Sequence, residues 1–338
     1  MSRRATALFA GLCVVWGIPY FMIKVAVAEV SPAVLVLGRT SLAVALLLPI
    51  ALARGVLGPV VRRWRPLLAF AAVEIAVPWF LLSDAERHLT SSLTGLLVAA
   101  VPLVGVGLAL LRPDGDRLGP LGLAGLVLGL LGVAVLVGLD VSGAQARAVA
   151  EMGVVVLGYA TGPVILSRWF ADASGLGVIT ASLAACAAVY VLPAALQWPA
   201  QMPSGQVIAA IVGLAVLCTA AAFLMMFELV AEIGPVRATV ITYVNPAVAV
   251  LAGVVLLNEP LTPATVIGFV LIVAGSVLAT RPSRSGSAAR SASAASASSE
   301  SGSLASASPA PVPRESPAPS VVPGARPAGQ VEPEPGCG

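Results

Sequence analysis

Long apolar stretches separated by short polar connectors run through the first 280 residues of the chain. An α-helix needs about 20 apolar residues to cross a bilayer, whereas a membrane-spanning β-strand needs only about ten. The connectors contain Pro, Gly, Asp and Arg, which are typical of turns. The pattern therefore predicts ten membrane-spanning helices, at residues 5–28, 32–53, 66–83, 89–111, 118–139, 150–168, 175–195, 206–227, 235–257 and 263–280.

The composition excludes an ordinary water-soluble protein. Of the 338 residues, 58% are hydrophobic and 10% are charged, whereas soluble domains contain about 25% charged residues. So few charges cannot cover a surface that faces water, and most of the surface must face lipid. The net charge of +3 is spread over short loops, so we predict no binding of nucleic acid.

The apolar pattern occurs twice in the sequence, with an offset of 144 residues. After a slip of one position the match continues, so that Gly125 and Gly132 recur as Gly268 and Gly275. Duplicated apolar units are common in secondary transporters. We predict a first repeat in residues 1–140 and a second in residues 141–280, each with five helices. The prolines that recur are Pro19, Pro49, Pro59 and Pro102, as Pro163, Pro193, Pro203 and Pro246.

The arginines predict how the helices are oriented. If the N-terminus is cytoplasmic, thirteen arginines lie at the inner side and only Arg87 and Arg147 lie outside, as the positive-inside rule requires. Both termini are then cytoplasmic. Because five helices is an odd number, the second repeat enters the membrane from the opposite side, and the two repeats are predicted to be inverted.

Residues 281–338 differ in kind from the rest of the chain. They are rich in Ser, Ala and Pro and contain almost no large apolar residues, so they cannot bury enough surface to fold. We predict a disordered cytoplasmic tail.

Several short motifs lie at characteristic places in the two repeats. They are Trp16-Gly17 followed by Phe21 and Lys24, Arg39 seven residues after Pro32, Pro102, Pro246, and Asn258-Glu-Pro-Leu-Thr-Pro263. Together they resemble the EamA branch of the drug/metabolite transporter superfamily, although the turn of the first repeat, Asp114-Gly-Asp116-Arg, has Asp in place of Glu. The resemblance implies ten helices around a central cavity and movement of small polar or amphipathic metabolites.

Three charged residues within the predicted helices stand out: Lys24, Arg39 and Glu74. A charge inside the bilayer costs about 2.5–3.5 kcal/mol and usually faces a cavity or a partner. The second repeat has Leu183 and Cys218 where the first has Arg39 and Glu74. We predict that Arg39 and Lys24 bind a substrate carboxylate or phosphate, and that Glu74 binds an amine or a proton. The alternatives are a static Arg39–Glu74 pair and a lysine that reaches the interface.

Several polar aromatic and amide side chains are predicted near the middle of the membrane. They suit the wall of a cavity, and the alternative is helix packing with interhelical hydrogen bonds. These candidates are Trp16, Tyr20, Tyr159, Tyr243 and Asn245.

Four mid-helix prolines are hinge candidates, because each removes a backbone hydrogen bond and favours a kink. The kinks either act as hinges or only shape the bundle, at Pro19, Pro102, Pro163 and Pro246. Gly125 and Gly129 allow close approach of another helix, either within the chain or in a homodimer.

The inventory of reactive side chains argues against an enzyme. The only lysine, Lys24, is followed by Val25, so the chain has no phosphate-binding Walker A motif. The only histidine is His88, and the four cysteines lack metal-binding spacing. We expect neither a cofactor nor a metal.

These observations predict a gradient-driven transporter in the bacterial cytoplasmic membrane. The family resemblance implies small metabolites, amino-acid-like or otherwise polar or amphipathic, as its substrates, and it also underlies the expected direction. Alternating access with export favoured over import is expected, and the partners are the lipid bilayer, the solute and protons. The alternatives are a non-transporting scaffold or sensor on the same fold and a membrane-embedded enzyme acting on lipid-linked substrates.

Overall fold

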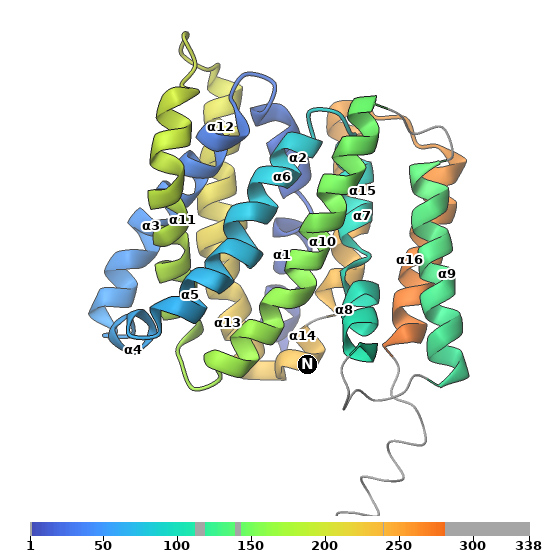
Figure 1. Ribbon diagram of the computed structural model, residues 1–338, viewed down its shortest axis with the longest axis horizontal. Coiled ribbons are helices and arrows are strands. Elements are labelled where there is room, and N and C mark those ends of the chain that lie inside the picture. The colour runs from blue at the N-terminus through green and yellow to red at the C-terminus, as the bar shows by residue number, and fades with distance from the viewer. Residues whose placement is uncertain (1, 112–118, 139–142, 239, 281–338) are drawn as a thin grey trace, which may run out of the picture. The chain divides into compact units, whose positions relative to one another are not determined.

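The computed structural model describes residues 2–111, 119–138, 143–238 and 240–280, and every regular element among them is a helix (Figure 1). The predicted tail and the turn at Asp114–Arg117 lie outside the described residues, so their predictions stay untested.

The helices follow one another with short connections. The first repeat contains α1 (Arg3–Val15), α2 (Pro19–Ala26), α3 (Pro32–Ala53), α4 (Gly58–Val61), α5 (Trp64–Phe70), the π-helix η1 (Ala71–Ala76), α6 (Val77–Ala85), α7 (Ser91–Val98), α8 (Val101–Leu110) and α9 (Pro120–Val137). The second contains α10 (Gly143–Trp169), α11 (Gly175–Leu196), α12 (Gly205–Ala215), the π-helix η2 (Val216–Ala221), α13 (Ala222–Ile233), α14 (Pro235–Ala238), α15 (Ile241–Leu257) and α16 (Pro263–Ala279).

Eight helical segments of the described chain are long and apolar enough to cross a membrane. They coincide with the first eight predicted spans. The last two predicted spans are present as shorter apolar helices, α15 and α16, of 17 residues each. The ninth predicted span, residues 235–257, covers α14 and α15.

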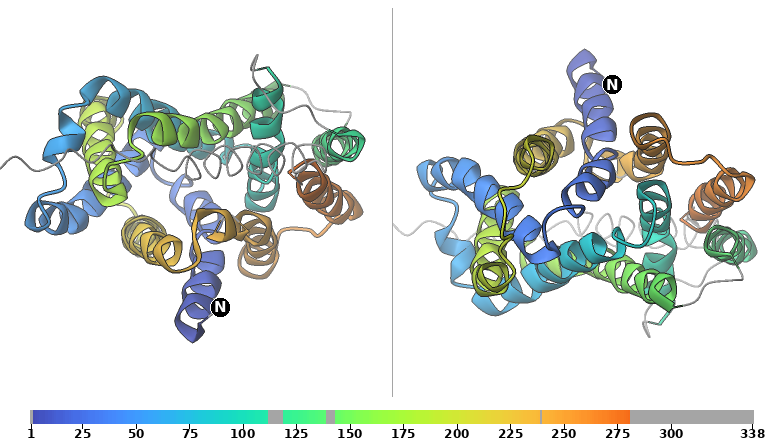
Figure 2. Two further views of the ribbon diagram at one scale, coloured as in Figure 1. Left: turned by 90° about the horizontal axis from the view of Figure 1, so that it is seen from below. Right: turned by 90° about the horizontal axis from the view of Figure 1, so that it is seen from above.

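Helices in equivalent positions of the two repeats pack against each other. The pairs are α3 with α11, α7 with α15, and α9 with α16. Other contacts come in exchanged pairs: α13 packs on α1 and α12 on α2, as α6 and η1 pack on α10. Exchanging the repeats therefore reproduces the packing, and Figure 2 shows the α9 and α16 pair at one edge of the bundle.

Glycines allow α9 and α16 to approach closely. A Cβ atom on Gly125 would lie 2.8 Å from the carbonyl oxygen of Gly275, and one on Gly275 would lie 2.6 Å from that of Gly125. Only glycine fits at such a crossing. The Gly125–Gly129 spacing therefore serves packing within the chain, and the homodimer stays a prediction.

The four predicted hinge prolines behave differently in the two repeats. Pro19 and Pro102 stand at or next to the start of α2 and α8, after short breaks that separate these helices from α1 and α7. Pro163 and Pro246 lie inside the continuous helices α10 and α15. Of these four prolines, only the two in the first repeat stand at breaks between helices.

Candidate functional site

Two π-helical segments lie at matching places in the repeats. Segment η1 covers Ala71–Ala76, and η2 covers Val216–Ala221, 145 positions later. This register pairs Glu74 with Thr219, one residue beyond the Cys218 that the sequence offset indicated. Single π-helical turns are rare and occur frequently at functional sites. The two segments therefore indicate a candidate site in the middle of the bundle.

Arg39 of α3 is held between these elements. Its side chain is buried, at 8% exposed, and its Nε donates a hydrogen bond of 2.9 Å to Oγ1 of Thr219. Its guanidinium lies 3.6 Å from the centre of a Trp79 ring, a cation–π contact from α6. Within the described residues, only Nε of Arg39 has a hydrogen-bond partner, so its planar NH₂ groups keep their donors for another acceptor.

Glu74 lies on η1 against α10. A Cβ atom on Gly162 would overlap the Glu74 carboxyl group, so glycine at this position is what admits the side chain. Oε2 of Glu74 is buried and has no hydrogen-bond partner in the described part of the chain. The carboxyl group is thus left with an unused acceptor inside the bundle.

Tyr159 of α10 connects the two charged residues in space. It is an electrostatic neighbour of both Glu74 and Arg39, and Tyr20 of α2 is a neighbour of Tyr159 and Arg39. None of the ion pairs between described residues joins Arg39 to Glu74. The structure therefore places four predicted residues in one cluster and does not contain the static Arg39–Glu74 pair.

The other predicted cavity residues lie outside this cluster and make helix contacts. The ring of Trp16 packs edge-on against Phe223 of α13 at 5.9 Å. The hydroxyl group of Tyr243 is 3.1 Å from that of Thr280.

Asn245 of α15 replaces a backbone hydrogen bond that is missing at the break between α1 and α2. With its amide oriented to satisfy both neighbours, the side-chain nitrogen donates to the carbonyl oxygens of Cys13 at 3.2 Å and Ile241 at 3.1 Å. The N–H of Gly17 bonds to Val14 instead of Cys13 at this break, so Asn245 supplies the donor that the Cys13 carbonyl has lost.

Lys24 lies away from the Arg39 cluster, at the end of the bundle where α2 and α6 finish and α7 begins. We call this the Lys24 end. Its Nζ donates to the backbone carbonyls of Glu86, at 2.5 Å, and Leu89, at 2.7 Å. At the same end, the Glu259 carboxylate accepts from the backbone N–H groups of Ser91 and Ser92 at the start of α7, at 2.7 and 2.9 Å.

The physical setting of Glu259 explains its charge state. Burial raises the pKa of this carboxyl group, but hydrogen bonds from Ser92 and Ser91 outweigh that effect, so the pKa is lowered. A carboxylate at a helix N-terminus also satisfies backbone donors that would otherwise have no partner. The acidic turn before α16 therefore fastens α15 and α16 to α7.

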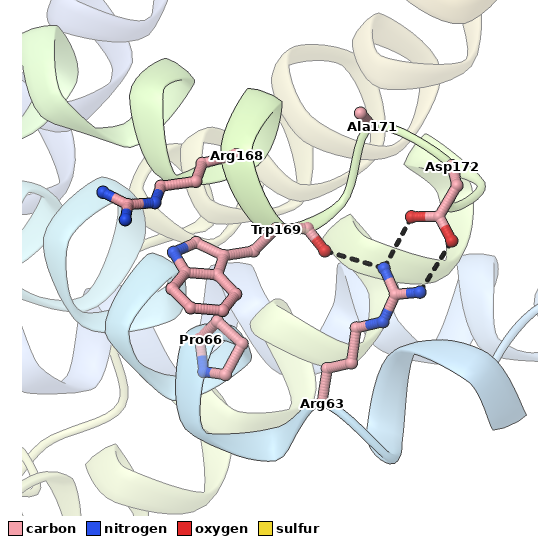
Figure 3. A pocket seen from close by; sticks show the side chains of 6 residues that line it. All are labelled: Arg63, Pro66, Arg168, Trp169, Ala171 and Asp172. Atoms are coloured by element: carbon pink, nitrogen blue, oxygen red, sulfur yellow. Dashed lines mark hydrogen bonds and ion pairs between the residues drawn. The ribbon is translucent and has the colours of Figure 1, made fainter.

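The opposite end carries a shallow pocket between α5 and the connection from α10 to α11 (Figure 3). We call this the Arg63 end. Arg63 donates to both carboxylate oxygens of Asp172, at 2.6 Å each, and to the Trp169 carbonyl at 2.7 Å. Because Arg63 and Asp172 are bonded to each other, and no predicted site residue lines the pocket, this pocket is not the candidate site.

Three residues of the cluster or its surroundings escaped prediction from sequence. Trp79 and Thr219 were not singled out, because the sequence offset pairs Glu74 with Cys218 and only the register of the π-helical segments pairs it with Thr219. Glu86 was missed because it follows the predicted third span and looks like a loop residue, yet its side chain is 0% exposed. In the described residues, no group of three or more His, Cys, Asp or Glu side chains could hold a metal ion.

Comparisons with known proteins place the chain in a wider setting. The model of the EamA-like transporter family matches twice, at residues 3–138 and 152–281. A solved structure titled "Crystal structure of protein" is 26% identical with a TM-score of 0.61, over 82% of this chain and 96% of that one. The search of curated proteins gave no match.

Proposed function

Because this chain belongs to the EamA-like transporter family, we propose that it carries a small zwitterionic solute, such as an amino acid, across the membrane by alternating access. Members of the family are multi-pass membrane transporters of small solutes rather than enzymes. The single observation that carries the proposal is that Arg39 and the Oε2 atom of Glu74 are both buried near Tyr159 without forming an ion pair.

The geometry of Arg39 supports a carboxylate as its ligand. Thr219 holds Nε, and Trp79 covers one face of the guanidinium group, so the remaining NH₂ groups form a planar fork. Such a fork matches a carboxylate with two parallel hydrogen bonds. Glu74, with an unused oxygen acceptor, supplies the complementary partner for an ammonium group or a proton.

The proposed transport cycle uses ten membrane-spanning helices in two inverted repeats of five. The exchange symmetry of the helix contacts supports this, and α15 and α16 serve as the ninth and tenth spans. A helix of 17 residues is about 26 Å long, close to the hydrocarbon thickness of about 30 Å. The inverted arrangement supports two states that exchange the conformations of the repeats.

We further propose that the chain lies in the bacterial cytoplasmic membrane with both termini inside and a disordered cytoplasmic tail. In this orientation the Lys24 end faces outward. A gradient of solute or protons drives the transport, with export favoured over import, and two copies associate as a homodimer. The arginine distribution supports the orientation.

Flux through liposomes tests the proposed substrate class. The purified chain is reconstituted and offered three sets of solutes: amino acids, the same acids without the amine, and the same amines without the acid. We expect saturable flux for the zwitterions only. In Arg39→Met the flux should fall by about 100-fold or more, because each charge-assisted hydrogen bond is worth about 1.5–3 kcal/mol.

Matched variants separate the site from general damage. Arg4→Met removes an arginine whose ion pair with Glu228 is exposed, and its flux should equal that of the wild type. Glu74→Gln should lose the preference for zwitterions and the dependence on pH. If the folded wild type moves none of the solutes, transport of zwitterions is wrong. If Glu74→Gln behaves as the wild type, Glu74 has no part in recognition.

A further inference from the structure

A second carboxyl group without partners lies at the Lys24 end. Glu86 follows α6 directly and its side chain is 0% exposed. Both of its carboxylate oxygens are buried and lack a hydrogen-bond partner in the described part of the chain. A buried, ionised carboxylate without hydrogen bonds is strongly disfavoured, so the surroundings of Glu86 decide its protonation state.

The surrounding charged groups are already bonded elsewhere. The Lys24 ammonium group from α2 donates to the backbone carbonyls of Glu86 and Leu89, and no ion pair in the described residues joins it to the Glu86 carboxylate. Glu259, from the turn before α16, is a negative neighbour. The other titratable groups nearby are Tyr20 on α2, and Asp84, Arg87 and His88 on the same segment as Glu86, where Asp84 is paired with Arg87 and Arg147.

We propose that Glu86 is a proton-binding residue, protonated while the Lys24 end is packed as in the structure and ionised when the ends of α2, α6 and α7 separate and admit water. A neutral carboxyl group suits an unbonded, buried position, whereas an ionised one needs water or an ammonium partner. Lys24, whose ammonium group bonds to carbonyls on both sides of the α6–α7 turn, is the partner closest at hand once that end opens.

The electrostatics of the site agree with this geometry. Burial raises the pKa of Glu86 well above its usual value, Lys24 opposes the shift, and Glu259 reinforces it. A group with a raised pKa in the folded chain binds more protons there than in the unfolded chain. Its stabilising effect is therefore complete below the usual carboxyl pKa and is lost as pH rises toward the folded value.

Thermal unfolding of the full chain against pH tests the proton site without using transport. Between about pH 5 and 8, Glu86→Gln should become more stable relative to the wild type by about 3 °C for each pH unit within the window. Glu29→Gln is the control, because Glu29 is exposed at the same end and its pKa is lowered by the Ser204 N–H group. It should not gain stability over this range.

If Glu86→Gln folds poorly, the stability of Glu86→Leu and an infrared difference spectrum test the same proton site. Glu86→Leu should fold and be at least as stable as the wild type near pH 8, because a protonated carboxyl group has little advantage over an apolar side chain. The infrared difference spectrum, wild type minus Glu86→Leu, should contain the carbonyl band of a protonated acid near neutral pH. Glu74 contributes equally to both proteins and cancels.

The opposite results would overturn the proposal. If Glu86→Gln and Glu86→Leu are both less stable than the wild type near pH 8 but equal to it near pH 5, Glu86 is ionised and paired with Lys24. Absence of the protonated-acid band has the same meaning. The coupling of this proton to opening rests on the proposed function, but the proton site does not, so a failure to find flux leaves these stability results intact.

Discussion

Helices α3 and α11 occupy equivalent places in the two repeats, but they carry Arg39 and Leu183 at the same position of the sequence repeat. Each packs against the π-helical segment of the other repeat: α3 against η2, and α11 against η1. In the first contact Arg39 donates to Thr219. In the second, Leu183 is the counterpart of Arg39 and Glu74 the counterpart of Thr219.

This comparison explains how a duplicated scaffold holds an unsymmetrical site. Both charges belong to the first repeat, but each lies against an element of the second, so the repeat symmetry places them in different halves of the site. They are neighbours of the same tyrosine, Tyr159, and they do not neutralise each other. Under the proposed function, a solute with separated charges binds Arg39 and Glu74 at the same time.

The largest effect is expected from filling the space on α10 that the Glu74 side chain occupies. Gly162→Ala puts a methyl group where the Glu74 carboxyl group lies, and overpacking of this kind costs about 1–3 kcal/mol. We expect a lower melting temperature and a loss of zwitterion flux of about tenfold or more. The measurements are thermal unfolding in detergent and flux in liposomes.

Gly153→Ala is the matched control on the same helix. Nothing lies within 4 Å of a Cβ atom at Gly153, and alanine is about 0.5–1 kcal/mol better than glycine in a helix interior. This variant should be slightly more stable, with unchanged flux. Equal losses in both variants would mean that α10 tolerates no substitution and that Glu74 is not specifically displaced.

The sequence was sufficient for the scaffold because its signals are repeated and strong. Apolar length predicted the spans, and the recurring prolines and glycines predicted the duplication. Arg39, Glu74, Tyr20 and Tyr159 were also among the candidates, because charged and polar aromatic residues are rare in such helices, but the sequence did not predict that these four lie together.

Other features depend on packing that no local pattern encodes. Whether Asn245 faces a cavity or the broken end of α1 depends on how α15 rotates. Thr219 is the partner of Arg39 because the π-helical segments shift the repeat register by one residue. Glu86 looks like an exposed loop residue in the sequence, and only the packing of the helices buries it. The surroundings of Asn245, Thr219 and Glu86 are therefore set by tertiary packing and not by the local sequence.

A smaller effect is expected from removing the hydrogen-bond acceptor that α3 contacts in the second repeat. Thr219→Val keeps the shape of the side chain but leaves Nε without its bond. A single hydrogen bond is worth about 1 kcal/mol, so the solute affinity should fall by about fivefold. Isothermal titration, or the rise in melting temperature with added solute, measures this affinity.

Thr161→Val provides the corresponding control. Thr161 donates to the carbonyl of Leu157 within its own helix on an exposed face, as Thr219 donates to that of Leu214. Both variants therefore lose the same kind of intrahelical bond, but only Thr219→Val affects Arg39. If the two variants bind the solute equally well, Thr219 does not position the guanidinium group.

The smallest expected effect concerns the acidic residues that follow the first helix of each repeat. At the Arg63 end, Asp172 accepts two bonds from Arg63. At the Lys24 end, Glu29 accepts one bond, of 2.6 Å, from the backbone of Ser204. Both residues connect to the start of a helix in the other repeat, so they are corresponding contacts of unequal strength.

Acid titration tests whether this inequality matters. The Arg63 hydrogen bonds lower the pKa of Asp172 to about 2, so the contact stabilises the chain above the usual carboxyl pKa of about 3.9 and is lost as pH falls toward 2. The wild-type melting temperature should therefore decrease more steeply below pH 4 than that of Asp172→Asn. Glu29→Gln should reduce this slope less. Since Asp172 is largely exposed and solvent screens such pairs, the difference will be small, and identical slopes in all three proteins would mean that neither contact holds its end of the bundle closed.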